Sequence, residues 1–275
     1  MEIRPTGAAL GMEVIGVDFR KPLPLQEREA IRQALLQSGV LFVRGQRLDE
    51  RQFVDFASLF GELESYGSTM NKFLKAGHPD ILVLSNIIED GKPVGVADAG
   101  EYWHTDRSYV PKPAWSSCLH AIEVPQADDG TPLGDTEFSS MIAAAKALPP
   151  ALRARADKLS AWHEYVFRFT DKNNSMPGVS HPLILPHPMT KAPCLYVNKG
   201  FTHRIVDLPD AESTALMEEL FEFAKRPEFV YRHKWQKGDL LLWDNYSTQH
   251  RATGGYALPQ RRLMWRTTIQ GVPLQ

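Results

Sequence analysis

Short apolar runs of strand length recur through the last two-thirds of this chain, without the regular strand and helix alternation of a doubly wound sheet. They are rich in leucine, β-branched and aromatic residues, which is typical of buried strands. The runs cover residues 80–84, 116–124, 195–198, 240–244 and 262–270. This order of elements predicts a mainly β fold, a sandwich or a barrel.

Helical patterns lie at the start of the chain and between the later strands. Apolar side chains recur at helical spacing over residues 26–37 and 50–59. The apolar run at 40–43 between them is typical of a buried strand. Two further helices are expected at 139–148 and 211–225. The β fold is therefore expected to carry flanking α-helices.

The chain is long enough for one sizeable core. It contains no internal repeat and no low-complexity linker, so we expect a single domain over residues 1–275. Two long polar loops, at about 85–100 and 171–181, interrupt it. Loops of this length inside a compact domain are commonly lids or binding loops.

Charge and composition limit the partners. The 31 basic and 33 acidic residues give a net charge of −2 with no long run of either sign, so no nucleic acid or membrane partner is expected. No apolar stretch approaches the roughly 20 residues of a membrane span. Cys118 and Cys194 lack CxxC spacing and are expected to be buried free thiols in a reducing compartment. We expect a cytoplasmic homo-oligomer that acts on a small molecule.

The stretch EYWHTDRSY at 101–109 contains a histidine and an aspartate separated by one residue. With nine histidines and 16 aspartates in 275 residues, chance alone gives roughly half a His-x-Asp pair. The pair by itself is therefore weak evidence for a metal site. A second pair, His78 and Asp80, contains a proline and is expected in a turn. The neighbours of His104 and Asp106 favour an extended backbone, in which both side chains point to one face. This pair is the candidate metal site.

A catalytic metal needs at least a third ligand. Two histidines and one carboxylate form the donor set of non-haem iron centres, which leave positions open for oxygen and substrates. The candidates for the third ligand are His120, His163, His181, His187, His203, His233 and His250. His250 is well placed because it follows the apolar run 240–244 and a short polar turn, and strand ends often open onto binding cavities.

Two arginines share one face of the last apolar run. Strand periodicity places Arg262 and Arg266 on the same side, and Arg261 on the other. Solvent-facing arginines are one interpretation. If that face lines a barrel, each guanidinium needs an anion, because a buried unpaired charge costs several kcal/mol. Two inward arginines would indicate two carboxylate-like ligands.

Taken together and in order, several stretches resemble the family of iron(II)- and 2-oxoglutarate-dependent dioxygenases that includes taurine dioxygenase and 2,4-dichlorophenoxyacetate dioxygenase. They cover nearly the whole chain: GMEVIGVDFRKPL, VLFVRGQ, WHTD, GDTEF, HPLILPHPMT, LYVNKGFTHRIVDLP, EFVYRHKWQKGDLLLWDN and QHRATGGYALPQRRLMWRTT. The resemblance implies a double-stranded β-helix, the cupin-like jelly roll. It also implies an oxidoreductase that uses Fe(II), 2-oxoglutarate and O2.

The resemblance further implies roles for the central residues. It implies that His104, Asp106 and His250 bind the iron. Thr136, in GDTEF, and Arg262, in QRR, match the positions that bind the far carboxylate of 2-oxoglutarate. Related halogenases lack the carboxylate ligand, so Asp106 favours hydroxylation.

The residues matched to the substrate pocket are less uniform. Arg266 matches the position that binds the acid group of anionic substrates, and Phe169 and Phe201 match pocket-lining positions. Tyr66 stands where sulfonate-hydroxylating relatives have a histidine, and their asparagine aligns near Gly100. These departures point away from taurine. An aryloxyalkanoate, another sulfonate or an amino-acid-like carboxylate is expected as substrate.

Two other function classes use similar residues. A zinc-dependent hydrolase also binds its metal through histidines and a carboxylate, but it would leave both inward arginines without a role. A non-catalytic, cupin-like binding protein would take up no oxygen. Metal analysis and oxygen uptake that depends on iron and 2-oxoglutarate distinguish the three classes.

Overall fold

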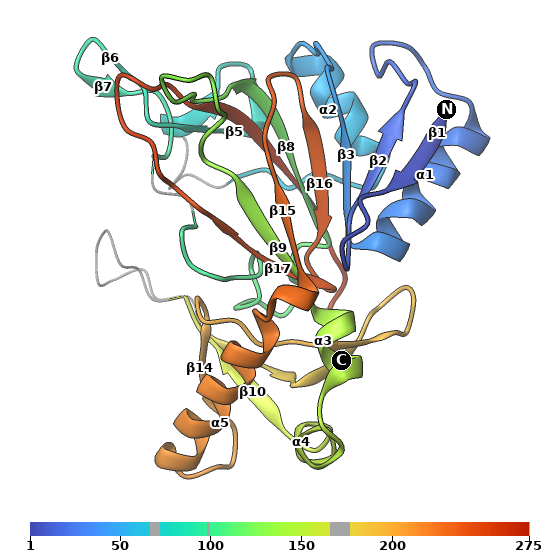
Figure 1. Cartoon of the computed structure of the whole chain (residues 1–275), viewed down its shortest axis with the longest axis vertical. Coiled ribbons are helices and arrows are strands. Elements are labelled where there is room, and N and C mark those ends of the chain that lie inside the picture. Colours follow the sequence, from blue (N-terminus) through green and yellow to red (C-terminus); the bar gives the residue numbers. More distant parts are fainter. Residues whose placement is uncertain (67–71, 98–99, 166–176, 275) are drawn as a thin grey trace.

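Two β-sheets face each other in the upper part of Figure 1, and a second layer of helices and short strands lies below them. The computed structural model describes residues 1–66, 72–97, 100–165 and 177–274. Helices pack against the outer face of the larger sheet. The expectation of a mainly β jelly roll with flanking helices is confirmed.

The larger sheet is mixed, with β2 and β3 parallel and its other neighbouring strands antiparallel. In spatial order its strands are β1 (Glu2–Pro5), β2 (Met12–Ile15), β3 (Val40–Val43), β16 (Leu240–Asp244), β8 (Ser116–Glu123), β18 (Leu263–Ile269), β5 (His78–Ser85) and β4 (Leu74–Lys75). The opposing sheet consists of β15 (Val230–His233), β9 (Thr136–Ser140) and β17 (Thr248–Ala252).

Smaller elements complete the fold. The lower layer contains β11 (Val179–Pro182), β10 (Ser160–His163) and β14 (Thr202–Ile205), and beside them β12 (Ile184–Pro186) and β13 (Pro193–Leu195). A hairpin is formed by β6 (Ile88–Glu89) and β7 (Lys92–Pro93). The helices are α1 (Leu25–Ser38), α2 (Glu50–Ser58), α3 (Met141–Ala147), α4 (Pro150–Ala156), α5 (Asp210–Ala224) and the 3-10 helix η2 (Pro227–Phe229).

The larger sheet is buried on both faces, which explains its continuous apolar runs. In β16, Leu240 and Leu242 pack with α1 and α2, whereas Leu241 and Trp243 face the smaller sheet. The inner core between the sheets also contains Phe138 of β9. Successive residues of β16 therefore contribute to two cores, one on each face of the larger sheet. The inner core lies next to the candidate site.

Local signals position the two helices of the outer layer. Helix α2 begins with a capping box, in which the Gln52 amide donates to the Asp49 side chain and the Asp49 amide donates to the Gln52 side chain. Helix α1 ends at Gly39, whose φ is +70°. A Cβ there would lie 2.8 Å from Thr248 Cγ2, so glycine is needed both for the backbone angle and for the approach to β17.

Two sequence predictions need correction. The strand expected at 195–198 lies earlier, at β13, where it pairs with β12. The pair His78 and Asp80 was expected in a turn, but it forms the start of β5. Gly77, with a φ of +79°, makes the turn just before it, because it can adopt a left-handed backbone at no steric cost.

The two expected lid loops differ in how much of them is described. The first folds back on β5, where the Ser85 amide donates to the Val96 carbonyl and the Val96 amide donates to the Val83 carbonyl, each at 3.0 Å. Of the second, residues 177–178 lead into β11 and residues 179–181 belong to that strand, and the remainder lies outside the described residues. A lid function for either loop stays a prediction.

Buried histidines connect the lower layer to the loop that follows Asp106. Ser108 Oγ lies 3.1 Å from His163 Nδ1 and accepts a hydrogen bond from Asn198 Nδ2, also at 3.1 Å. His181 Nε2 lies 3.0 Å from the Ser108 carbonyl oxygen and must donate to it, because a carbonyl only accepts. These contacts hold the turn that carries Asp106.

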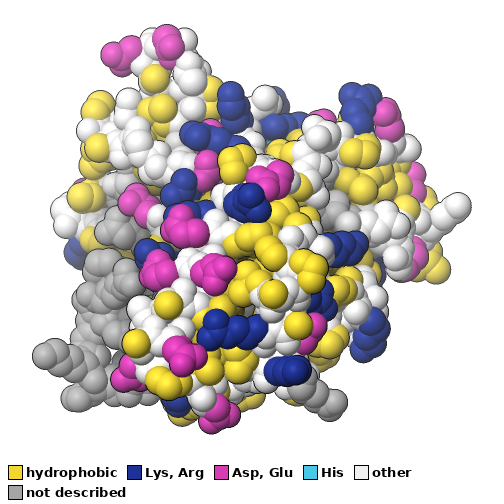
Figure 2. Space-filling view, turned by 60° about the horizontal axis from the view of Figure 1, so that its bottom comes forward, with side chains coloured by type: hydrophobic (Ala, Val, Ile, Leu, Met, Phe, Trp, Pro, Cys, Tyr) yellow, Lys and Arg dark blue, Asp and Glu magenta, His cyan; other side chains and the backbone are white. Residues whose placement is uncertain are grey.

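The lower layer presents mixed charges to the outside. Figure 2 shows lysine and arginine side chains next to acidic ones on this face, with hydrophobic side chains between them. A nucleic-acid backbone is bound by clustered basic residues, and this face has no continuous basic surface. Among the described residues, no helix has the length and apolar character to cross a membrane.

We predict that the protein loses stability as the pH falls below the ordinary histidine pKa of about 6.5. Burial lowers the pKa of His163 to about 3, so the unfolded chain takes up a proton that the folded chain excludes. His163 then lowers the free energy of unfolding by up to about 1.4 kcal/mol per pH unit between these two pKa values. Urea unfolding across this pH range measures the effect.

In His163→Gln the free energy of unfolding should depend less steeply on pH. The reason is that unfolding then takes up as much as one proton fewer than in the unchanged protein. His203→Gln is the control, because His203 is exposed. The same pH dependence in His163→Gln and in the unchanged protein would contradict the prediction.

Candidate metal centre

Main-chain pairing brings the two central histidines together. The His104 amide donates to the His250 carbonyl at 3.0 Å, and the His250 amide donates to the His104 carbonyl at 2.8 Å. Directly opposed residues of an antiparallel pair present their side chains on the same face. The two imidazole rings are therefore neighbours, with centroids 4.2 Å apart. Of the seven histidines considered as third ligand, the fold selects His250.

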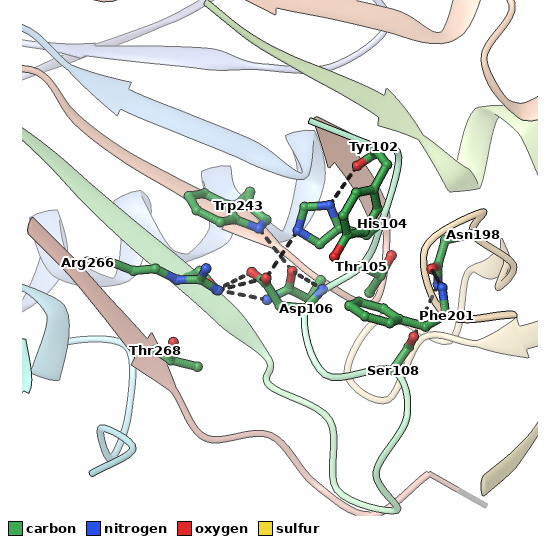
Figure 3. Close-up of polar contacts among 12 residues, drawn as sticks. Tyr102, His104, Thr105, Asp106, Ser108, Asn198, Phe201, Trp243, Arg266 and Thr268 are labelled. Carbon is green, nitrogen blue, oxygen red and sulfur yellow. Dashed lines mark hydrogen bonds and ion pairs between the residues drawn. The ribbon is translucent and has the colours of Figure 1, made fainter. Parts of the chain in front are cut away.

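Asp106 completes the cluster (Figure 3). Its Oδ1 lies 3.7 Å from His104 Nε2, and one donor atom each of His104, Asp106 and His250 lies within 4.8 Å of the others. All three residues are buried. The predicted extended backbone holds at His104, whereas Asp106 begins a turn in which Arg107 has a φ of +58°. The turn, and not strand periodicity, directs the carboxylate toward the imidazoles.

The protonation states suit a divalent cation. His104 Nδ1 lies 2.8 Å from the Tyr102 carbonyl and must donate to it, so Nε2 keeps its lone pair. Burial lowers the pKa of both His104 and His250. Burial would raise the pKa of Asp106, but Arg266 and the histidines hold it below its usual range. Two neutral imidazoles and one carboxylate are a donor set that fits iron(II).

Thr136 and Arg262 each carry a donor that has no acceptor among the described residues. Thr136 pairs with Ala252, and Phe138 pairs with His250, so Thr136 shares a face with His250 two positions along the strands. Trp235 Nε1 donates to Thr136 Oγ1 at 3.0 Å, which leaves the hydroxyl hydrogen available. Arg262 is buried, and its Nε has no hydrogen-bond partner among the described residues. A buried guanidinium donor without a partner indicates a site for an anion.

The end of β5 holds the backbone of Arg262. The Arg262 amide donates to Asn86 Oδ1 at 2.8 Å, and Ser85 Oγ donates to the Arg262 carbonyl at 2.8 Å. Burial lowers the pKa of Arg262 from its ordinary high value. Arg261 has an exposed side chain that donates to Glu123 at 3.0 and 3.2 Å. The expected alternation is observed. The solvent-facing interpretation of Arg262 and Arg266 is wrong, because Arg262 is buried and Arg266 is largely buried, whereas Arg261 lies on the other side of the strand and is exposed.

Arg266 extends from β18 toward Asp106 (Figure 3). Its Nη2 is 2.7 Å from Asp106 Oδ1 and 3.4 Å from Ser117 Oγ, and its side chain is 17% exposed. Burial would lower its pKa, but Asp106 raises it, so the guanidinium stays charged. Tyr66 Oη lies 2.8 Å from Thr268 Oγ1, on the same face of β18 as Arg266.

An aromatic wall stands beside His104. Phe201 is buried, with its ring centroid 5.9 Å from that of His104 and 4.8 Å from that of Tyr109. Tyr109 belongs to the EYWHTDRSY stretch, but the sequence analysis assigned it no role. Phe169, the other phenylalanine expected to line the pocket, lies outside the described residues.

Two glycines leave space for His104. A Cβ on Gly100, whose φ is +81°, would lie 2.4 Å from His104 Cε1. A Cβ on Gly200 would lie 2.9 Å from His104 Cβ. Contacts this short force the imidazole to move. Gly100, noted as a departure from sulfonate-hydroxylating relatives, is thus required by the position of the ring in this chain.

Trp243, Ser117 and Asn245 also lie at the candidate centre, although the sequence indicated no site role for them. The ring of Trp243 lies 4.7 Å from that of His250, and alternation along 240–244 is a signal that could have placed it inside. Ser117 donates to the Asp106 carboxylate and accepts from Asn245. These contacts depend on long-range pairing, so no local sequence pattern indicates them.

The chain matches the family described as "Taurine catabolism dioxygenase TauD, TfdA family" over residues 2–268. It is 34% identical to the α-ketoglutarate-dependent 2,4-dichlorophenoxyacetate dioxygenase of Cupriavidus pinatubonensis, over 94% of this chain and 93% of that protein. It is 32% identical to pentalenolactone F synthase of Streptomyces arenae, over 96% and 93%. The structure resembles that of AAD-2 with Mn(II) and N-oxalylglycine, with a TM-score of 0.86, 31% identity and coverage of 100% and 99%.

α-Ketoglutarate is another name for 2-oxoglutarate, so these comparisons agree with the dioxygenase interpretation. They give no support to a zinc hydrolase or to a binding protein without turnover. The chain belongs to the taurine catabolism dioxygenase TauD, TfdA family, whose members are 2-oxoglutarate-dependent dioxygenases and hence oxidoreductases.

Proposed function

We propose that this dioxygenase uses Fe(II), 2-oxoglutarate and O2 to hydroxylate a small anionic organic substrate, with release of succinate and CO2. The observation that carries the proposal is the buried cluster of His104, Asp106 and His250, with donor atoms within 4.8 Å of one another. Its two neutral imidazoles and ionised carboxylate are the facial donor set of non-haem iron oxygenases.

His104 Nε2, Asp106 Oδ1 and a ring nitrogen of His250 would hold the metal. When bound, iron(II) lets 2-oxoglutarate and O2 react to succinate and CO2, with one oxygen atom inserted into a substrate C–H bond. The protein groups orient and enclose the reactants. The Tyr102 carbonyl fixes the tautomer of His104, and burial keeps both imidazoles neutral.

Arg262 and Thr136 would bind the far carboxylate of 2-oxoglutarate. The Nε of Arg262 lacks a protein acceptor among the described residues, and the hydroxyl of Thr136 accepts from Trp235 and can donate its own hydrogen. The AAD-2 structure, which shares 31% identity, holds Mn(II) and N-oxalylglycine, an analogue of 2-oxoglutarate. These two ligands support the use of a divalent metal and 2-oxoglutarate here.

Charge balance supports an anionic substrate. Asp106, the buried Arg262 and the largely buried Arg266 together carry a formal charge of plus one. A divalent metal and the dianion 2-oxoglutarate bring equal and opposite charges, so the excess remains. Buried charge without a counterion is costly, and a singly charged anion near Arg266 would neutralise it.

The aromatic wall favours a substrate with apolar surface next to its acid group. Phe201, Tyr109 and Tyr66 lie around His104 and Arg266, and the relative from Cupriavidus acts on an aryloxyacetate. Aryloxyalkanoates, sulfonates and amino-acid-like carboxylates are therefore the proposed substrate classes. Hydroxylation is proposed because Asp106 supplies the carboxylate ligand.

We further propose a cytoplasmic homo-oligomer without a nucleic-acid partner. Cys118 and Cys194 are buried free thiols, as expected from the sequence, and they support a reducing compartment. Light scattering measures the oligomeric state.

We predict that Asp106→Ala abolishes substrate-coupled succinate formation, because the metal loses its anionic ligand. Succinate is measured with iron, 2-oxoglutarate and an activating substrate. Asp80→Ala is the matched control, since Asp80 belongs to the other His-x-Asp pair at the start of β5. Undiminished coupled turnover in Asp106→Ala would sink the assignment.

Arg262→Gln is predicted to raise the KM for 2-oxoglutarate by about 10- to 100-fold, since a hydrogen bond to a charged group contributes roughly 1.5–3 kcal/mol. Initial rates of succinate formation against 2-oxoglutarate concentration give this constant. Arg261→Gln, which removes the exposed neighbour, should leave it unchanged. Equal KM values for the two variants would rule out the role of Arg262.

A screen of small sulfonates, aryloxyalkanoates and amino-acid-like carboxylates should identify activators that raise succinate formation above the uncoupled rate. Phenoxyacetate and its neutral amide make a matched pair, and we predict that the acid is the better activator because Arg266 binds an anion. If every activator lacks an anionic group, the role of Arg266 is wrong.

A further inference from the structure

A chain of buried hydrogen bonds runs behind Asp106. Trp243 Nε1 donates to Asn245 Oδ1 at 2.9 Å, and Asn245 Nδ2 donates to Ser117 Oγ at 3.2 Å. Ser117 Oγ lies 2.6 Å from Asp106 Oδ2. Trp243, Asn245 and Ser117 are fully enclosed. This series of hydrogen bonds therefore links the inner core of the larger sheet to the carboxylate that faces the two histidines.

The chemistry of each group sets the direction of every bond in this chain. An indole N–H can only donate, so Asn245 must present its oxygen to Trp243 and its amino group to Ser117. Arg266 Nη2 also approaches Ser117 Oγ, at 3.4 Å, and it too can only donate. With two donors on its lone pairs, the Ser117 hydroxyl has its single hydrogen left for Asp106 Oδ2.

The two oxygens of Asp106 are consequently not equivalent. Oδ2 accepts from Ser117, whereas Oδ1 lies 3.7 Å from His104 Nε2 and 2.7 Å from Arg266 Nη2. The Asp106 amide also approaches Asn245 Oδ1, at 3.4 Å, so Asn245 contacts both the backbone and the partner of this residue. The carboxylate is thereby held in one orientation, with Oδ1 toward the imidazoles.

We propose that Ser117 and Asn245 are positioning residues that fix Asp106 so that Oδ1 alone binds the metal. The inference rests on the proposed function in that it assumes a metal at His104, Asp106 and His250. Residues that orient metal ligands in this way commonly raise the metal affinity about 10- to 100-fold. The loss of one hydrogen bond to a charged group lowers an affinity by roughly the same factor.

The sheet register explains why these residues meet. Ser117 of β8 pairs with Trp243 of β16 on one side and with Thr268 of β18 on the other, at the centre of the larger sheet. The histidines instead come from the smaller sheet and from the residue bridged to it. Asp106 is therefore the ligand that joins the candidate metal centre to the larger sheet.

The test is the affinity for Mn(II) alone, measured by calorimetry on the metal-free full-length protein. Ser117→Ala is expected to weaken Mn(II) binding about 10- to 100-fold. Ser117→Thr keeps a hydroxyl at this position and should restore an affinity close to that of the unchanged protein. Ser116→Ala is the matched control, because the neighbouring hydroxyl donates to the Trp243 carbonyl and is equally buried.

Thermal unfolding of the metal-free variants separates positioning from loss of structure. Weak Mn(II) binding by Ser117→Ala, with a Tm like that of Ser116→Ala and with rescue by Ser117→Thr, supports the proposal. Equal Mn(II) affinities for Ser117→Ala and Ser116→Ala overturn it. If Ser117→Ala does not fold, Ser117→Cys, a weaker donor of similar size, is judged by the same comparison. Failure of the unchanged protein to bind Mn(II) would instead overturn the proposed function.

Discussion

The pair of main-chain hydrogen bonds between His104 and His250 is the constraint on which the candidate centre depends. It attaches a loop residue to the edge of the smaller sheet and so places two imidazoles side by side. Gly100 and Gly200 leave the space that the first ring occupies. With the two imidazoles held side by side, the turn at Asp106 has to place only the carboxylate next to them.

Buried charge is the second organising feature. Asp106 and Arg266 offset each other through a 2.7 Å contact, whereas Arg262 retains a donor without a partner among the described residues. A metal at Asp106 competes with Arg266 for the same oxygen, Oδ1, and would leave the guanidinium to attract another anion. The proposed metal and an anionic substrate would in this way be linked through a single carboxylate.

The proposed substrate site combines this charge with aromatic surface. Phe201 and Tyr109 stand next to His104, while Tyr66 is hydrogen-bonded to Thr268 on the strand that carries Arg266. A tyrosine at position 66 presents a larger apolar surface than the histidine of sulfonate-hydroxylating relatives. Charge and shape therefore point to the same kind of ligand, an acid group attached to an apolar body.

Short-range patterns in the sequence determined much of the frame. Apolar runs predicted β3, β16 and β18, because side-chain alternation along a strand is a local property. The same alternation separated Arg262 and Arg266 from Arg261. Family resemblance added the candidate metal, 2-oxoglutarate and substrate residues, whose roles remain proposals.

Tertiary structure decided the rest, because the deciding contacts join residues that are far apart in the chain. Local patterns could not select His250 among the candidate histidines, since strand pairing makes that choice. They also predicted an extended backbone at Asp106, where a turn occurs. The roles inferred for Ser117 and Asn245 arise from the register of β8 and β16, which no single stretch of sequence encodes. The sequence by itself determined which side chains each strand offers to each face; the packing of the two sheets decided which of them meet.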